Sequence, residues 1–353
     1  MGEEHQKAWI HRTTHLNKVS HNDLLPKMTN HQNDVALSEL IGFILLLGLV
    51  LIAMSMYTVY VVPVNGREDE ITQMSYVESQ FTDYKLMVDT LWTSRLINVN
   101  GANPMYPVLN VSPMISSTTM KLGTGGTAQL GGSSLALFNP VPSYGTLSIN
   151  TTGDTFAIDS SSYHNSPDNK GEFPINISAL QYSSHNYYWI QQQYTYELGG
   201  VFLSQDNGTI NRISPLISIN NAANNAVTVN IVPVQVFGNQ RYSSNGPIRI
   251  DTLQRTPSNY NISSSLYRNN QWVNISITTP SNATAAMWLS LFNATAVREQ
   301  LLPAAYTTGR SYGPGVKTVY INITGKNPTP LVLLYVQRAD FDVTLNYVAT
   351  QST

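Results

Sequence analysis

The chain has no cysteine, and charged residues make up only 11% of its 353 positions. Without cysteine there can be no disulfide framework, so an exported domain of this size must be stabilised by core burial. The formal net charge is −2 with both signs scattered, which excludes the basic footprint of a nucleic-acid-binding protein. Asn, Ser, Thr, Gly and Tyr provide the polar surface instead, and this argues against the strongly acidic surface of a halophilic protein.

Residues that usually carry catalysis are also scarce. The sequence contains no G-x-S-x-G, no Walker loop, no H-E-x-x-H and no cysteine nucleophile, and only His164 and His185 follow residue 70. Asp340 and Asp342 would share one face of a strand, which allows a paired-carboxylate role. A solvated strand face explains them more simply. We therefore predict a non-enzymatic protein with no catalytic residues, no bound metal and no cofactor.

Long apolar runs are absent except for one, from Leu40 to Val62. Its residues carry no charge, and as a helix they would extend roughly 34 Å at about 1.5 Å per residue. That length crosses a hydrocarbon core of about 30 Å. Tyr57 and Tyr60 lie near the end of the run, where aromatic rings favour the membrane interface. The run predicts a transmembrane helix over residues 37–63.

The charges on either side of the run predict its orientation. Four Lys and Arg residues precede it, and only Arg67 and Lys85 follow within about 20 residues, which favours a cytoplasmic N-terminus and an extracellular C-terminal domain. Two alternatives stay open. Ala53-Met54-Ser55 resembles the cleavage site of a secretory signal, and a buried core helix would also be apolar. The polar segment 1–36 is expected to be a disordered or cleaved leader.

A second helix is expected over residues 67–100, after a break at Pro63–Gly66 and a return to water at Arg67-Glu68-Asp69-Glu70. Its apolar positions recur every three or four residues, which is one helical stripe. The stripe consists of Ile71, Met74, Val77, Phe81, Tyr84, Val88 and Leu91. Two interpretations fit: a helix that packs on its own domain, or a stalk that packs on copies of itself, because the spacing approaches a heptad seam.

From about Gly101 the pattern changes to short alternating segments separated by turn residues. Residues 101–353 are therefore expected to form a mainly antiparallel, β-sandwich-like domain. With the two helices that precede this domain, the whole chain is predicted to be α+β. The expected strands include 118–122, 134–138, 146–150, 194–198, 227–236, 248–253, 272–278, 318–323, 331–336 and 341–348. Pro233 indicates an edge strand or a bulge. One covering helix is expected at about 282–301, between an N-cap at Ser281 and a stop at Pro303.

Two local features of this domain have more than one explanation. Tyrosine and tryptophan concentrate between residues 182 and 196, where they could line a sugar- or protein-binding surface or fill the core. They are Tyr182, Tyr187, Tyr188, Trp189, Tyr194 and Tyr196. Asp206-Asn207-Gly208 is best explained as a hairpin turn. A calcium site there is the alternative, but it lacks flanking acids.

Nine N-x-[ST] sequons follow residue 70, slightly more than chance would give, and they agree with an exported glycoprotein. The candidate N-glycosylation sites are Asn110, Asn150, Asn176, Asn207, Asn261, Asn274, Asn282, Asn293 and Asn322.

The stretch Asp34-Val-Ala-Leu-Ser-Glu-Leu-Ile-Gly-Phe-Ile-Leu resembles the N-terminus of archaeal type IV pilin-like proteins. In these, a small residue and an apolar-Ser-Glu-apolar-Ile/Leu-Gly sequence open a long hydrophobic helix. Tyr194-Thr-Tyr-Glu-Leu-Gly-Gly-Val-Phe resembles a region of large, uncharacterised members of that group, where one anchor helix leads into a β-rich outer domain. Val35, at a position where a charged residue is usual, and the long leader depart from the family pattern.

The resemblance implies that a prepilin-peptidase-like enzyme removes the leader after Ala36. The candidate processing and assembly residues are then Ala36, Leu37, Ser38 and Glu39, with Glu39 third in the mature chain. In an assembly, Glu39 could pair with the new N-terminal amine of a neighbour, or it could simply lie among headgroups. The resemblance also implies that the helix packs with copies of itself or with other pilin-like subunits, and Gly42 and Gly48 would permit close approach.

Three hypotheses about function follow. The first is a pilin-like, membrane-anchored surface glycoprotein that forms or decorates a type IV pilus-like filament. The second is a single-span surface adhesin or binding module that does not polymerise. The third is an anchored hydrolase that acts on cell-surface polymers.

Overall fold

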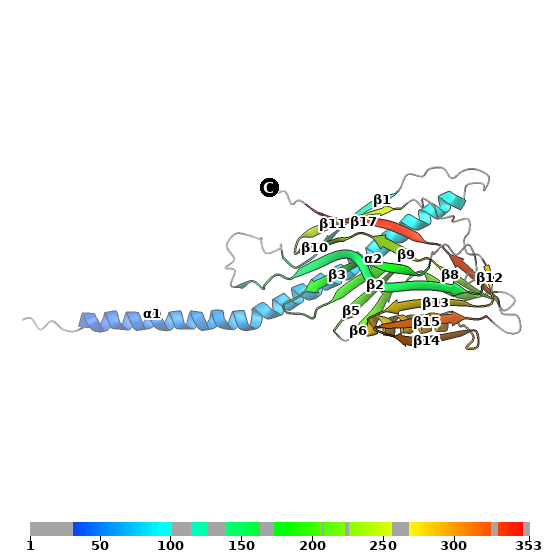
Figure 1. The fold of residues 1–353 in the computed structure, drawn as a ribbon. Helices are drawn as coiled ribbons and strands as arrows, with labels where there is room; N and C mark the ends of the chain where they lie inside the picture. Colours follow the sequence, from blue (N-terminus) through cyan, green and yellow to red (C-terminus); the bar gives the residue numbers. More distant parts are fainter. Residues whose placement is uncertain are drawn as a thin grey trace, which may run out of the picture. The chain divides into compact units, whose positions relative to one another are not determined.

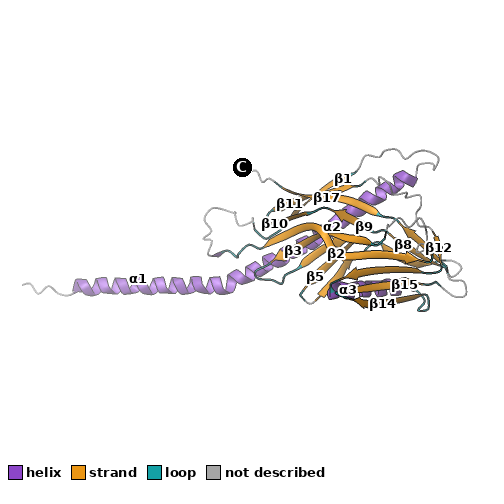
Figure 2. Cartoon of the chain, in the orientation of Figure 1, coloured by secondary structure: helices purple, strands orange, loops and turns teal. Residues whose placement is uncertain are grey.

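The computed structural model describes residues 31–100, 114–125, 138–162, 173–206, 208–222, 226–255, 268–325 and 331–348 (Figure 1). Its contacts divide the chain into two compact units, Met1–Ser55 and Met56–Thr353. The first unit contributes all but the last residue of helix α1 (His31–Met56). The second contains the remaining helices and all the described strands (Figure 2). Residues 31–36 of the expected leader are helical, and the rest of the leader lies outside the described residues.

The helical backbone does not break at Pro63–Gly66, so that prediction was wrong. A π-helical segment, η1 (Tyr57–Val61), follows α1, and α2 (Val62–Asn100) starts directly after it. Proline has no N–H and cannot bond the carbonyl four residues earlier in an α-helix. Here the Val62 N–H bonds the carbonyl of Tyr57, five residues earlier. We attribute the continuation to this wider turn, which changes the hydrogen-bond register just before the proline.

Three sheets form the β domain. The four-stranded sheet A has the order β1 (Ile115–Lys121), β11 (Pro247–Gln254), β17 (Ala339–Tyr347), β9 (Val234–Phe237). The nine-stranded sheet B has the order β14 (Tyr306–Gly313), β15 (Val316–Ile323), β13 (Val273–Thr279), β2 (Tyr144–Ser160), β3 (Ile175–His185), β4 (Gln193–Glu197), β5 (Gly200–Gln205), β6 (Gly208–Ile213), with β10 (Gln240–Ser244) also beside β2. The four-stranded sheet C has the order β12 (Arg268–Asn270), β16 (Val332–Val336), β8 (Val227–Ile231), β7 (Ile217–Asn221).

Most strand pairs are antiparallel, and the α+β prediction is confirmed. The exceptions are two parallel pairs, β8 with β16 and β9 with β17. Pro233 lies between β8 and β9, where the chain passes from sheet C to the edge of sheet A. Its missing N–H therefore costs no ladder bond inside either strand. The expected strand 227–236 is thus two strands, and the expected strand 134–138 lies outside the described residues except for Phe138.

Two hydrophobic cores lie against sheet B. The first packs the α2 stripe between sheet A and part of sheet B, and all stripe residues except Ile71 are buried. The structure therefore answers the question left open for this helix, because the stripe faces its own domain. The second core packs sheet C and helix α3 (Asn282–Arg298) against the rest of sheet B. The helix expected at 282–301 is confirmed, and the Ser281 hydroxyl caps it by accepting the Thr284 N–H.

The strand β4 is buried on both faces because it lies between these two cores. Tyr194 and Tyr196 point into the first core. Thr195 lies opposite Phe202, a member of the second core, and both Thr195 and Glu197 are buried. The alternation of Tyr194 and Tyr196 with Thr195 and Glu197 suggests one buried and one solvent-exposed face. In the structure both faces are buried.

Candidate functional sites

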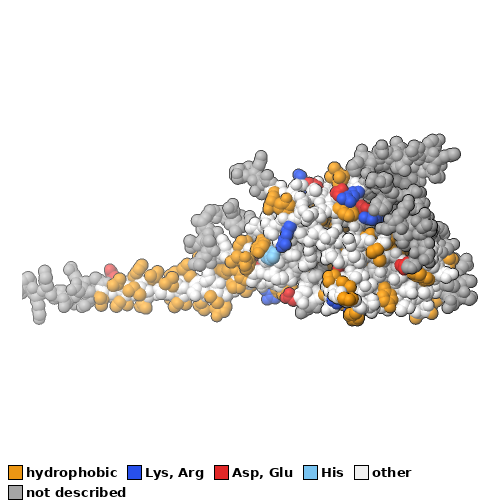
Figure 3. All heavy atoms as spheres, in the orientation of Figure 1, with side chains coloured by type: hydrophobic (Ala, Val, Ile, Leu, Met, Phe, Trp, Pro, Cys, Tyr) orange, Lys and Arg blue, Asp and Glu red, His pale blue; other side chains and the backbone are white. Residues whose placement is uncertain are grey.

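Among the described residues, one helix is long and apolar enough to cross a membrane. It covers Leu37–Thr93, its most apolar window has a mean hydropathy of 2.6, and none of that window is buried. Hydrophobic side chains cover the exposed helix in Figure 3. A core helix of a soluble domain would be covered by its own chain, so the exposure excludes the core-helix alternative.

The candidate processing residues lie within helical backbone. Leu37, Ser38 and Glu39 are exposed in α1, which already begins at His31. The Ala36 side chain lies outside the residues whose side chains are described. A Cβ atom added at Gly42 or Gly48 would meet no side chain or distant backbone atom within 4 Å among the described residues, so no described part of the chain packs on these small positions. They leave room for close approach by another helix.

The described sequons divide by exposure. Asn150, Asn176, Asn282 and Asn293 are exposed, while Asn110, Asn207 and Asn261 lie outside the described residues. Asn274 and Asn322 are only half-exposed, and they lie directly opposite each other on β13 and β15. Both line one cavity of about 460 Å³, together with Asp159, Trp272, Tyr320 and Thr324. The Asn322 Oδ1 atom is buried without a hydrogen-bond partner.

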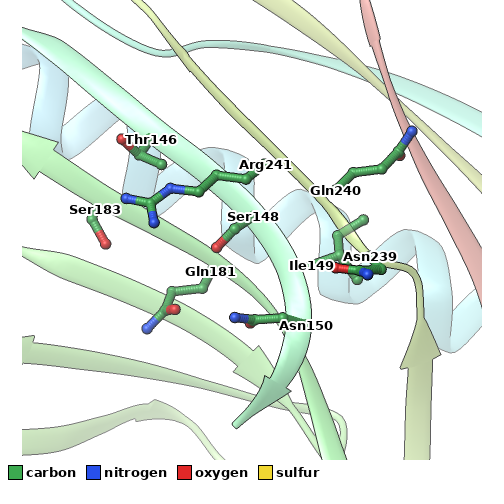
Figure 4. Close-up of a pocket in the computed structure, with 9 residues that line it drawn as sticks. All are labelled: Thr146, Ser148, Ile149, Asn150, Gln181, Ser183, Asn239, Gln240 and Arg241. Carbon is green, nitrogen blue, oxygen red and sulfur yellow. The ribbon is translucent and has the colours of Figure 1, made fainter.

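A polar cavity of about 280 Å³ lies on the face of sheet B that the strands β2, β3 and β10 share. The residues around it are Thr146, Ser148, Ile149, Asn150, Gln181, Ser183, Asn239, Gln240 and Arg241. Figure 4 shows the Arg241 guanidinium among the Thr146, Ser148 and Ser183 side chains. Amides and hydroxyls dominate the lining and no carboxylate contributes to it, so the cavity suits a polar ligand better than acid–base chemistry.

Glu197 and Asp154 are two buried carboxyl groups that the sequence did not identify as a site. Glu197 is 4% exposed, and Asp154 is buried where the register between β2 and β3 shifts. Burial first, and the nearby Asp154 carboxylate second, raise the pKa of Glu197 to about 8. The Trp288 indole N–H lowers this pKa partly, although it makes no hydrogen bond of full geometry. Burial also raises the pKa of Asp154, against hydrogen bonds from Thr279 and Thr152. The only sequence feature that indicates a buried acid is the position of Glu197 within the largely apolar stretch 194–203.

The structure also places the aromatic concentration, the two neighbouring aspartates of β17 and the turn at Asp206. Tyr182, Tyr194 and Tyr196 belong to the core, whereas Tyr187 is exposed, so the aromatic concentration splits between the two explanations. Asp340 and Asp342 each pair with an arginine, Arg338 and Arg255 respectively. The turn at Asp206 is confirmed, because β5 and β6 form an antiparallel hairpin across it.

Glu70 also departs from expectation. The sequence places it in a charged run that returns the chain to water, but its side chain is 1% exposed. Its two carboxylate oxygens accept hydrogen bonds from the backbone N–H groups of Tyr187 and Tyr188. Such bonds from donors to a buried charge replace the hydration that burial removes.

No protein-family model, curated protein or solved structure matches this chain. The described residues also contain no group of three or more His, Cys, Asp or Glu side chains that could hold a metal ion. The function must therefore be inferred from the exposed helix and the surface of the β domain.

Proposed function

We propose that the chain is a non-enzymatic, membrane-anchored surface glycoprotein of the archaeal type IV pilin-like kind, which forms or decorates a filament. The observation that carries this proposal is the uncharged, exposed helical surface of residues 40–61, which begins directly after Ser38-Glu39. Ser-Glu just ahead of a membrane helix is unusual, because a carboxylate at the membrane edge is costly. In this proposal the N-terminus is cytoplasmic and the β domain is extracellular.

A helix that is apolar on every side needs a partner other than water. Lipid tails provide one, and neighbouring apolar helices provide another of similar polarity. The α2 stripe is already buried within the β domain, so it leaves residues 37–62 as the surface through which copies would associate. The same surface therefore serves anchoring before assembly and packing after it.

The mature N-terminus tests the processing step. The full-length chain, purified from an archaeal host that has a prepilin peptidase, should begin at Leu37 when its N-terminal peptide is analysed by mass spectrometry. Ala36→Gly keeps a small residue before the cut and should still be processed, whereas Ala36→Leu should block cleavage. A mature chain that begins at Met1, or beyond Ala53, would contradict pilin-type processing.

The alternative function is an anchored adhesin that never polymerises, and the polar cavity between β2, β3 and β10 favours it. Its amide and hydroxyl lining is the kind of surface that recognises a sugar or another polar group. Shearing cells and separating filaments from membranes distinguishes the two functions. Processed chain in the filament fraction supports the filament subunit, whereas processed chain confined to membranes supports the adhesin.

A further inference from the structure

A short loop between β3 and β4 is fixed onto α2 by a buried acid. Glu70 Oε1 accepts the Tyr187 N–H at 2.7 Å, and Oε2 accepts the Tyr188 N–H at 2.8 Å. The loop is also closed on itself, because Asn186 Nδ2 donates to the Ile190 carbonyl and Gln191 Nε2 donates to the Asn186 carbonyl. These bonds hold the loop backbone rigid beside the beginning of α2.

A second segment, residues 138–141, joins the same region. The Tyr188 ring lies so close to Gly66 that a Cβ atom there would overlap with it. The Tyr188 hydroxyl accepts the Val141 N–H at 3.1 Å. Further back along the helix, the rings of Phe138 and Tyr57 meet edge to face at 5.4 Å. Both segments are therefore fixed against the helical turns between Tyr57 and Glu70.

This rigid framework holds apolar side chains out to solvent. Tyr187 is 59% exposed, Val141 is 50% exposed and Ile190 is 43% exposed. We refer to these three residues as the collar. The helical turns beside them expose further apolar side chains, including Tyr60 and Val64. Hydrophobic side chains are visible on the β-domain surface in Figure 3. These hydrogen bonds thus position groups that no other described part of the domain covers.

The charges beside the collar do not favour an anionic partner. The Arg67 guanidinium lies over the Trp189 ring, 4.5 Å from its centroid. Glu68 and Asp69 are exposed on the same turn of α2, so the local charge balance is slightly negative. Attraction to a surface must therefore come from the aromatic and aliphatic side chains.

We propose that the collar lies in the interfacial layer of the bilayer that the helix spans, with zwitterionic lipid headgroups as its partner. This proposal rests on the membrane anchoring proposed above. Tyrosine rings favour that layer because they have an apolar body and a polar tip. Residues 56–62 complete the apolar run and belong to the same compact unit as the collar, so the end of the membrane-spanning segment and the collar are parts of one unit. The contact fixes the tilt and height of the β domain above the membrane.

The absence of native cysteine permits a direct test. Spin labels are attached to Tyr187→Cys and Ile190→Cys in the full-length chain, reconstituted into phosphatidylcholine vesicles. Ile210→Cys on β6 and Tyr312→Cys on β14 are control positions of comparable exposure. Collisions with oxygen, which concentrates in lipid, and with a water-soluble nickel chelate are compared at each site. At 187 and 190 the ratio of oxygen to nickel collisions should exceed the control ratio several-fold, and high salt should leave it unchanged.

The possible failures are distinguishable. If the chain floats with the vesicles but all four labels show the same aqueous ratio, the collar proposal is overturned while anchoring stands. If the chain does not float with the vesicles, anchoring fails and the collar fails with it. Labels at 187 and 190 that are aqueous in vesicles and shielded only in filaments assign the surface to a neighbouring copy, which also overturns the proposal.

Discussion

The buried carboxyl of Glu197 makes the stability of the β domain depend on pH. Glu197 is the last residue of β4, and Asp154 and Trp288 are the side chains that influence its carboxyl electrostatically. No cation among the described residues offsets its charge. We expect Glu197→Gln, which keeps the shape and removes the ionisable group, to abolish most of this pH dependence.

The size and sign of the effect follow from the pKa values. Burial raises the pKa of Glu197 from 4.5 to about 8. Above pH 4.5 the unfolded chain releases this proton, whereas the folded chain keeps it until about pH 8. The contribution of Glu197 to stability is therefore fully present below pH 4.5, falls as the pH rises, and is lost above pH 8. At about 1.36 kcal/mol per pH unit, the full loss is roughly 5 kcal/mol as an upper limit.

Denaturant unfolding of the full-length chain in a non-ionic detergent, followed by tryptophan fluorescence, measures this dependence across the same pH range. The exposed Glu68→Gln makes the same chemical change outside the core and serves as the control. The wild type and the control should lose stability between pH 5 and pH 8, and Glu197→Gln should lose much less. Equal slopes for all three chains would refute the assignment of a neutral, buried Glu197.

Three further outcomes are expected. Phe81→Ala opens a cavity in the first core and should lower the unfolding free energy by about 3–5 kcal/mol, whereas the exposed Leu86→Ala on the same helix should change it by less than about 0.5 kcal/mol. Glu70→Gln replaces one acceptor oxygen with a donor, so it should cost about 1–3 kcal/mol and speed hydrogen exchange of the two loop N–H groups. Asn274 and Asn322 are cross-strand neighbours with Cβ atoms roughly 5 Å apart, so glycopeptide mapping should never find both fully occupied.

The elements with a clear local signal could be predicted from the sequence. The uncharged run of residues 40–62 predicts an exposed helix, because no other pattern in the chain could surround it. The stripe from Met74 to Leu91 predicts the buried face of α2, since its spacing matches the helical period. Ser281 predicts the beginning of α3 because its hydroxyl caps the free N–H groups there. In each case neighbouring residues alone determine the outcome.

The features that depend on distant contacts could not be predicted. The alternating pattern predicts that Glu197 faces solvent. It is buried because the two cores lie on opposite sides of β4. The charged run 67–70 predicts that Glu70 faces solvent. It is buried because its hydrogen-bond donors, the Tyr187 and Tyr188 N–H groups, lie more than a hundred residues away in the sequence. The spacing of the stripe could not tell self-association from intramolecular packing, because either partner needs the same apolar face.

The two apolar surfaces of the helical region differ in a way that bears on function. Residues 40–62 are apolar on all sides, and burying one face would leave the others in water, so only a surrounding apolar medium or a ring of helices suits them. The stripe of α2 is apolar on one side and, apart from Ile71, is buried against the sheets of its own domain. The first surface ends with η1, and between the two surfaces lies the turn that carries Gly66; the 138–141 and 186–191 segments are attached along this stretch. In the proposed anchoring, a large domain held at a fixed height above a bilayer would need rigid attachment at that boundary, and the bonds to Glu70 and Tyr188 are placed to provide it.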